Sequence, residues 1–399
     1  MRMLARLVVL SFAVGICLSA CETNKTATQE VLENQFVSPL AFGLDIVRES
    51  APCSFAVSPV AYYELFGLMR IGAGVNTKRL LSPYQLPPAE YAQINKASND
   101  VYFLRISDVW AENSKEFCAW YGDTLTNNGF MYHSVSRAEA LEFINGWFEE
   151  QTLGTVFPYF EQEECPKFSE RTVLFTNAVT FEGEWQKPFV AYEQDVFHQR
   201  PEVDNEHAIA SPRVERYVHN GESEGWYFEN EKEQVLSLSF KDTSYRFMIV
   251  MPRESLPSEH PWEGYSVERI KELHEALEYT KNIDIHLVSF KTEANLYISA
   301  LDNSNSTLEQ LSGLFVEPMS YPKMFTTPET LDLAPITQRC IFSLGIEGTD
   351  YSEDNSCSLP VMESNLRAAR KFVTERPFLY VLYREDIGID NALLVGIYE

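Results

Sequence analysis

The segment Gly221-Glu222-Ser223-Glu224-Gly225 matches GxSxG, the pattern that presents a nucleophilic serine in many hydrolases. That chemistry requires a buried strand before the serine and a helix after it. Residues 217–220 before the motif and 226–228 after it do not have this strand-and-helix pattern. Two glycines around acidic residues are instead more typical of a hairpin turn. HExxH, P-loop and dinucleotide-binding motifs are absent from the sequence. The sequence therefore predicts a protein that is not an enzyme, without a cofactor and without a metal site.

A long segment without a regular pattern, near the C-terminus, is a better candidate for a functional element. An apolar run over residues 336–346 leads into Glu347-Gly348-Thr349, and the next apolar run covers residues 376–382. A loop of this length is uncommon in a compact domain and is usually functional or disordered. We therefore expect the function to lie in this loop.

The N-terminus has the features of a secretory signal. Arg2 and Arg6 precede an apolar stretch over residues 7–16, which is too short to span a membrane comfortably. The following Leu18-Ser19-Ala20-Cys21 looks like a bacterial lipobox, which predicts a signal peptide over residues 1–20 and a lipid on Cys21. Polar residues 22–30 would then be a tether, and the protein would be anchored at the cell envelope, on the outer membrane or the surface. An ordinary signal peptide or an uncleaved anchor is the alternative.

Composition limits the possible partners. The 399 residues include 58 acidic and 32 basic side chains, and 45% of them are hydrophobic. Such a chain can bury a large core and cannot be disordered throughout. Removal of residues 1–20 takes away Arg2 and Arg6, which leaves 30 basic side chains and a net charge of −28. A surface this acidic repels nucleic acid, so we expect no nucleic-acid partner.

The cysteines do not form a recognisable framework. Five lie beyond the signal and Cys21, an odd number, and none has a CxxC or zinc-ligand spacing. Free thiols are therefore expected, although an oxidising compartment would permit a disulfide. These residues are Cys53, Cys118, Cys165, Cys340 and Cys357, of which Cys357 lies in the long loop.

Helix patterns come mostly first in the chain and strand patterns follow. Apolar periodicity predicts helices over residues 31–48, Pro59–Gly72 and residues 138–152. Apolar and β-branched runs predict strands over residues 172–181, 235–240, 245–251 and 392–398. This order favours an α+β fold over alternating βαβ units.

Several short motifs occur together in an order that closely resembles the serpin family. They cover nearly all of residues 30–399, and the two blocks that contain tryptophan are the specific ones. The motifs are Ser58-Pro59 with Gly72-Ala73 and Asn76-Thr77; Ile144-Asn145-Gly146-Trp147 with Thr152 and Gly154; Asn177-Ala178 with Phe181, Gly183, Trp185, Pro188 and Phe189; Glu347-Gly348-Thr349; and Arg376-Pro377-Phe378 with Gly396.

The resemblance implies a single serpin domain over residues 31–399, with about three β-sheets and eight or nine helices. Residues 172–181 would be a central strand of the large sheet. Ser58, Asn177 and Trp185 would belong to the region where that sheet opens. Residues 347–376 would form an exposed reactive-centre loop.

The resemblance also implies a mechanism, the covalent trapping of a target protease, either serine or possibly cysteine. The protease attacks the loop and forms an acyl-enzyme, and the freed loop then inserts into the large sheet as an additional strand. The serpin supplies no catalytic residue of its own. The protein would act as a monomer, and its membrane contact would be the lipid alone.

Insertion makes a physical demand on the loop hinge. Alternate side chains of a strand point to opposite faces of the sheet. The hinge comprises Glu347, Gly348, Thr349, Asp350, Tyr351 and Glu353. Counted from Thr349, the inward-facing residues after it are Tyr351, Glu353, Asn355 and Cys357, where inhibitory family members carry small residues. A buried, unpaired Glu353 would oppose insertion. The alternative function is therefore a non-inhibitory binding module, or a protease substrate, on a serpin scaffold.

Two further departures concern the network around Asn177. Gln338 stands where many family members place a histidine, and Ala61 replaces a common second serine, so we expect a weaker network.

The sequence leaves two candidate positions for the cleavage site in the loop. A count forward from the hinge places the scissile bond after Met362, before Glu363. A count back from Pro377 places it near Leu366 and Arg367, where Arg370 and Lys371 would offer further trypsin-like sites.

Overall fold

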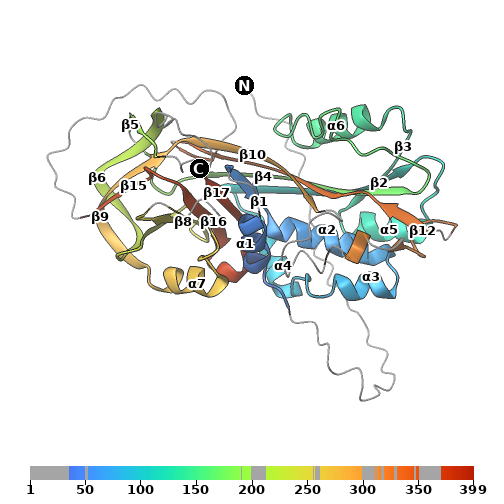
Figure 1. Ribbon diagram of the computed structural model, residues 1–399, viewed down its shortest axis with the longest axis horizontal. Coiled ribbons are helices and arrows are strands. Elements are labelled where there is room, and N and C mark those ends of the chain that lie inside the picture. Colours follow the sequence, from blue (N-terminus) through green and yellow to red (C-terminus); the bar gives the residue numbers. More distant parts are fainter. Residues whose placement is uncertain are drawn as a thin grey trace, which may run out of the picture.

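The structure is a computed structural model, and it describes residues 36–49, 53–189, 191–198, 213–254, 256, 261–298, 311, 313–315, 319–327, 330–345, 347–349 and 370–399. Two large β-sheets and a set of surrounding helices make an α+β fold, as the sequence predicts (Figure 1).

Eight helices are present among the described residues, within the expected range. Seven are α-helices and the last is a short 3-10 helix. Their bounds are α1 Pro39–Glu49, α2 Pro59–Gly72, α3 Val75–Leu80, α4 Pro88–Ile94, α5 Ala119–Asn127, α6 Ala140–Gln151, α7 Val267–Glu275 and η1 Ile389–Asn391.

Serine caps set the starts of the first two helices. The Ser58 hydroxyl accepts a hydrogen bond from the Ala61 N–H, and Pro59 fills the first helical position, so α2 has the bounds that the sequence predicts. The Ser38 hydroxyl accepts from the Ala41 N–H in the same way. For this reason α1 begins at Pro39, later than residue 31, and residues 31–35 lie outside the described residues.

Within the described residues, one sheet has eight strands and is built around β4. β4 pairs with β2 along one edge and, along the other edge, with β12, β13 and β14 in turn. Strand β2, which the sequence patterns did not indicate, is antiparallel to β4 over nearly its whole length. The strands are β2 Val101–Glu112, β3 Met131–Val135, β4 Thr172–Glu184, β10 Phe290–Ile298, β11 Met319–Ser320, β12 Thr330–Leu333, β13 Ile336–Leu344 and β14 Gly348–Thr349.

The other sheet has nine strands in the part of the chain that the structure describes. Its strand β6 pairs with β5 over residues 213–218, with β9 over residues 216–227 and with β7 over residues 226–229, so two of the expected three sheets are joined into one. The strands are β1 Phe55–Val57, β5 Ala191–Val196, β6 Arg213–Glu229, β7 Glu233–Ser239, β8 Tyr245–Pro252, β9 Glu278–Val288, β15 Arg370–Val373, β16 Phe378–Arg384 and β17 Leu394–Tyr398.

The prediction of a hairpin turn at residues 221–225 is wrong. β6 runs through this segment as a strand paired with β9, with register shifts between His219 and Ser223 and between Ser223 and Glu224. A β-bulge absorbs the extra residues here, so the turn signal bends the strand without ending it. Ser223 lies within a strand. A nucleophile elbow would place the serine at a strand-to-helix turn, so the structure agrees with the rejection of that motif.

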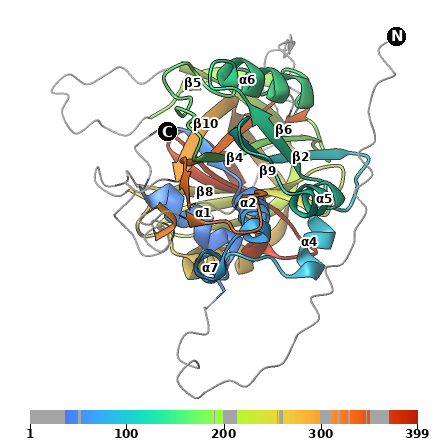
Figure 2. The same ribbon diagram turned by 90° about the vertical axis from the view of Figure 1, so that its right-hand side faces the viewer.

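Two cores lie on opposite faces of the eight-stranded sheet. α6 covers one face, while α2 and α5 lie on the other (Figures 1 and 2). The smaller core fills the space between α6 and the sheet and includes Trp110, Phe148 and Tyr159. The larger core includes α1, α2 and the nine-stranded sheet. Any rearrangement of β4 and β13 therefore disturbs packing on both faces.

Candidate hinge and sheet-opening site

The central feature of the site is the seam where β4 and β13 run parallel. The two strands pair from Thr176 and Thr337 to Thr180 and Ile341. Beyond that point β13 continues beside β10, and β4 continues beside β2. The pairing of β4 with β13 therefore ends before either strand ends.

The hinge pairs with the end of β4, beyond this seam. β13 ends at Leu344, the chain reverses direction, and β14 pairs antiparallel with β4 through Gly348 opposite Glu184 and Thr349 opposite Gly183. The Gly345 N–H donates to the Gly348 carbonyl at 2.6 Å and closes the turn. Thus the first residues of the predicted loop already form a short strand of the large sheet.

Gly348 is required for this turn. Its φ is +152°, and a Cβ atom at this position would lie 1.9 Å from the Gly183 carbonyl oxygen. That oxygen belongs to the backbone and cannot move aside without breaking the pairing with β4. Any larger residue would therefore displace the hinge.

Trp185 holds the turn through both of its N–H groups. Its backbone N–H donates to the Glu347 carbonyl at 2.7 Å, and its indole N–H donates to the Gly345 carbonyl at 3.1 Å. The ring is fully buried and stacks on Phe240, with 4.6 Å between ring centroids. The sequence analysis did not predict that Trp185 would hold the hinge in this way.

Thr349 faces the interior, as predicted from the resemblance. Only 4% of its surface is exposed, and its hydroxyl lies 3.5 Å from the Gly183 carbonyl oxygen. Glu347, in contrast, is exposed.

The network around Asn177 is complete, so the expectation that Gln338 weakens it is wrong. The Ser58 N–H donates to Gln338 Oε1 at 2.7 Å, and Gln338 Nε2 donates to the Ser58 carbonyl at 3.0 Å. Gln338 Nε2 also lies 3.2 Å from Asn177 Oδ1, and Asn177 Nδ2 donates to the Ser107 hydroxyl at 2.7 Å. An amide carries both a donor and an acceptor, so Gln338 satisfies α2 and β4 together. The Ser58 hydroxyl donates to the Leu393 carbonyl at 2.8 Å.

The far end of the loop returns at β15, which pairs parallel with β9. Arg370 and Lys371 are exposed at the start of that strand. The other predicted loop positions lie outside the described residues, as do Cys21 and the signal segment. These loop positions are Asp350, Tyr351, Glu353, Asn355, Cys357, Met362, Glu363, Leu366 and Arg367.

Four cysteines are free thiols in the described part of the chain, as expected, and Cys357 lies outside it. Cys340 is buried in β13, whereas Cys53 is exposed.

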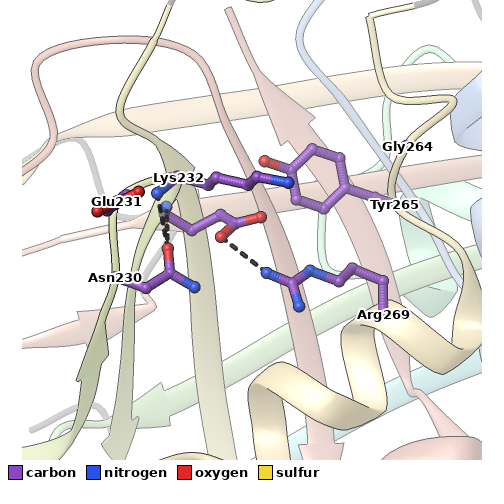
Figure 3. Close-up of a pocket in the computed structure, with 7 residues that line it drawn as sticks. Asn230, Glu231, Lys232, Gly264, Tyr265 and Arg269 are labelled. Carbon is purple, nitrogen blue, oxygen red and sulfur yellow. Dashed lines mark hydrogen bonds and ion pairs between the residues drawn. The ribbon is translucent and has the colours of Figure 1, made fainter.

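A pocket lies on the other sheet, between the β6–β7 turn and α7 (Figure 3). Its lining includes the Glu233 carboxylate, which is paired with Arg269 Nη2 at 2.8 Å. Asn230 Oδ1 accepts from the backbone N–H groups of Lys232 and Glu233 and so shapes the turn. No serine, cysteine or histidine is among the described residues that line it.

Groups of three or more metal-ligating side chains do not occur within the described ranges. The same ranges contain no helix that is long and apolar enough to cross a membrane.

The profile of the family described as Serpin (serine protease inhibitor) matches residues 38–396. The chain therefore belongs to the serpin family, a class that consists mostly of protease inhibitors.

Curated relatives share low sequence identity with this chain. Serpin-Z4 of Arabidopsis thaliana is 22% identical, and the match covers 92% of this chain and 95% of that protein. Leukocyte elastase inhibitor of Xenopus tropicalis is 23% identical, with 88% and 96% covered. Serpin I2 of Homo sapiens is 23% identical over 60% of this chain, and the match spans 56% of that protein.

Solved structures agree on the fold. Human thyroxine-binding globulin complexed with thyroxine has a TM-score of 0.72 at 15% identity, covering 90% of this chain and 97% of that one. Tengpin, a thermophilic serpin in its native state, has a TM-score of 0.69 at 15% identity, with 95% and 96% covered.

Proposed function

We propose that this serpin inhibits serine proteases by offering its reactive-centre loop, residues 347–376, as bait and inserting the cleaved loop between β4 and β13. The observation that supports this proposal most strongly is the short strand β14, which is antiparallel to β4 beyond the seam. A loop inserted between β4 and β13 would have to run antiparallel to β4 and to begin where β14 lies. A cysteine protease is a second class of target.

The register of β14 specifies where the loop side chains would go. Each later residue of an antiparallel strand pairs one residue earlier on its partner. Extension from Thr349 opposite Gly183 would place Tyr351 opposite Phe181, and Glu353 opposite Val179. Asn355 would then lie opposite Asn177.

These neighbours differ in how well they suit the loop. Asn177 takes part in a polar network, so Asn355 would find hydrogen-bonding groups there. Val179 is fully buried on the core face. Its cross-strand neighbour on β2, Arg105, is already paired with Glu64 at 3.0 Å. Glu353 would therefore enter a buried site, and the cation on the far side of β4 already has a partner.

This opposition at Glu353 favours a second candidate function, a non-inhibitory serpin that binds a partner or serves as a protease substrate. An unpaired buried carboxylate costs several kcal/mol or takes up a proton, and either effect slows insertion. If the acyl-enzyme hydrolyses first, the protease escapes.

The deciding experiment is to cleave the loop of a soluble form that begins at residue 31 and to compare thermal unfolding of the intact and cleaved proteins. Insertion would raise the unfolding temperature of the cleaved form by tens of degrees, since an added central strand pairs along two edges. An unchanged temperature would reject inhibition by insertion. Incubation with elastase-, chymotrypsin- and trypsin-like proteases, followed by denaturing electrophoresis and mass spectrometry, would reveal trapped complexes and the cleaved bond. The position of the cleaved bond, either after Met362 or near Leu366 and Arg367, would decide between the two candidate sites.

We also propose that the protein is a lipoprotein of the bacterial cell envelope, attached through Cys21. The support is the Leu18-Ser19-Ala20-Cys21 sequence that follows the apolar stretch. Expression in a bacterium with labelled fatty acid should label the natural protein but not Cys21→Ala. Labelling of both, or of neither, would reject lipid attachment at Cys21.

A further inference from the structure

Tyr159 lies at the seam between β4 and β13, on the face that α6 covers. It follows α6, and Asn145 of that helix holds its position, since Asn145 Oδ1 accepts from the Tyr159 N–H at 3.0 Å. The Tyr159 ring stacks on Phe148 of α6 with 4.0 Å between ring centroids. The side chain is fully buried. Tyr159 is thus attached to α6 by its backbone and by its ring.

The hydroxyl group of Tyr159 contacts both strands of the seam. The Asn177 N–H of β4 donates to this hydroxyl at 3.1 Å. The hydroxyl oxygen lies 3.0 Å from the Asn177 carbonyl oxygen and 3.0 Å from the Thr337 carbonyl oxygen of β13. Its single proton can be donated to one of these carbonyls at a time.

The register shows what the hydroxyl does there. Asn177 is paired with Gln338, and in a parallel ladder an N–H points to the carbonyl of the residue before its partner. Only every second residue of a strand directs its N–H in this way, and Asn177 is one of them here, because the hydroxyl that accepts from its N–H also lies 3.0 Å from the Thr337 carbonyl oxygen. The Tyr159 hydroxyl accepts from the Asn177 N–H and is within donating distance of the Thr337 oxygen, so it bridges the two strands at this position.

We propose that Tyr159 controls the separation of β4 from β13 by linking α6 to this seam. The inference rests on the proposed insertion of the loop, because insertion requires the two strands to part. On the core face, Gln338 joins β13 to Asn177 and to Ser58 of α2. Asn177 is therefore joined to β13 from both faces, and the Tyr159 link must break before a new strand can enter.

A change of pH within the physiological range should not break the hydrogen bonds of the Tyr159 hydroxyl. Burial raises the pKa of the Tyr159 hydroxyl well above its ordinary value, so the group keeps its proton at physiological pH. A movement of α6, on which the Tyr159 ring stacks, is the physical event that would release it.

Tyr159→Phe tests the proposal, because it removes the hydroxyl and keeps the ring. Peptide-resolved hydrogen exchange on the intact protein should show about tenfold faster exchange in residues 172–184 and 336–344, since a buried N–H loses its acceptor. Tyr380→Phe is the matched control. Tyr380 is also fully buried, and its hydroxyl donates to the Phe55 carbonyl at 3.1 Å, in the other sheet. Exchange at the seam that is unchanged in Tyr159→Phe, or equally fast in both variants, would overturn the proposal.

A second measurement separates control of the seam from a general loss of stability. After loop cleavage, Tyr159→Phe should gain thermal stability about tenfold faster than the natural protein and reach the same final unfolding temperature. If Tyr159→Phe lowers the unfolding temperature of the intact form and of the cleaved form equally, relative to the natural protein, the hydroxyl only stabilises the fold. If the natural protein gains no stability on cleavage, the proposed inhibition fails, yet hydrogen exchange still decides whether Tyr159 closes the seam.

Discussion

Ser58 and Gln338 form two hydrogen bonds with each other in the centre of the molecule. The Ser58 N–H donates to Gln338 Oε1 at 2.7 Å, and Gln338 Nε2 donates to the Ser58 carbonyl at 3.0 Å. Because Ser58 caps α2 and Gln338 belongs to β13, the pair joins the central helix to a strand that the proposed loop insertion would separate from β4.

Gln338→His should make this junction sensitive to pH. A neutral imidazole can accept from the Ser58 N–H, but an imidazolium cannot, and burial lowers the imidazole pKa in the fold below its unfolded value of about 6.5. The added stability is present above pH 6.5 and is lost as the pH falls. Unfolding in urea should show a loss of about 1–2 kcal/mol between pH 8 and pH 5 that the natural protein lacks. Matching pH profiles for the two proteins would refute this prediction.

Gly348→Ala should displace the hinge from β4. The new Cβ would lie 1.9 Å from the Gly183 carbonyl oxygen, so β14 cannot keep its pairing. We expect faster hydrogen exchange at residues 347–349 and slower gain of stability after loop cleavage. Gly146→Ala is the control, because a Cβ there meets no atom within 4 Å. Retained protection at the hinge in Gly348→Ala would count against the assigned register.

Replacing Tyr351 and Glu353 together by alanine should assist insertion. Extension of the β14 register would bring both side chains to buried positions beside Phe181 and Val179. Removal of a carboxylate that would be buried without a counter-ion should increase the trapped fraction of protease at least tenfold. Asp354→Ala, on the outward face, is the matched control and should change little. A gain by the control alone would show that the predicted facing is wrong.

His274 should weaken the fold at acidic pH. Burial lowers its pKa, with a smaller lowering by Arg246 and an opposing effect of Glu385. Its Nε2 lies 3.1 Å from the Tyr383 hydroxyl. Because the folded pKa is below the unfolded one, the stability from neutral His274 is complete above pH 6.5 and declines as the pH falls.

His274→Gln should therefore flatten the stability profile between pH 7 and pH 5. The control is His198→Gln, since His198 is exposed. Unfolding in urea at each pH measures both variants, and an equal flattening in the two would remove His274 as the cause.

The sequence alone determined the features that depend on local chemistry. Ser58 followed by Pro59 sets the start of α2, since a hydroxyl cap and a fixed φ act within one turn. The apolar run that begins at residue 172 forms β4 because such a run needs burial on both faces. The serpin family and the α+β class followed from motifs spread over the whole chain, and the family profile agrees with them.

The tertiary structure decided what depends on contacts between distant segments. Residues 221–225 carry a turn signal, yet pairing with β9 keeps them in a strand. Gln338 departs from the family pattern and still completes the network, because its amide reaches Ser58 and Asn177 together. The Tyr159 hydroxyl reaches a seam between strands that are far apart in sequence. Hydrogen bonds of this kind depend on positions in space to within a fraction of an ångström, and neither spacing nor composition specifies such positions.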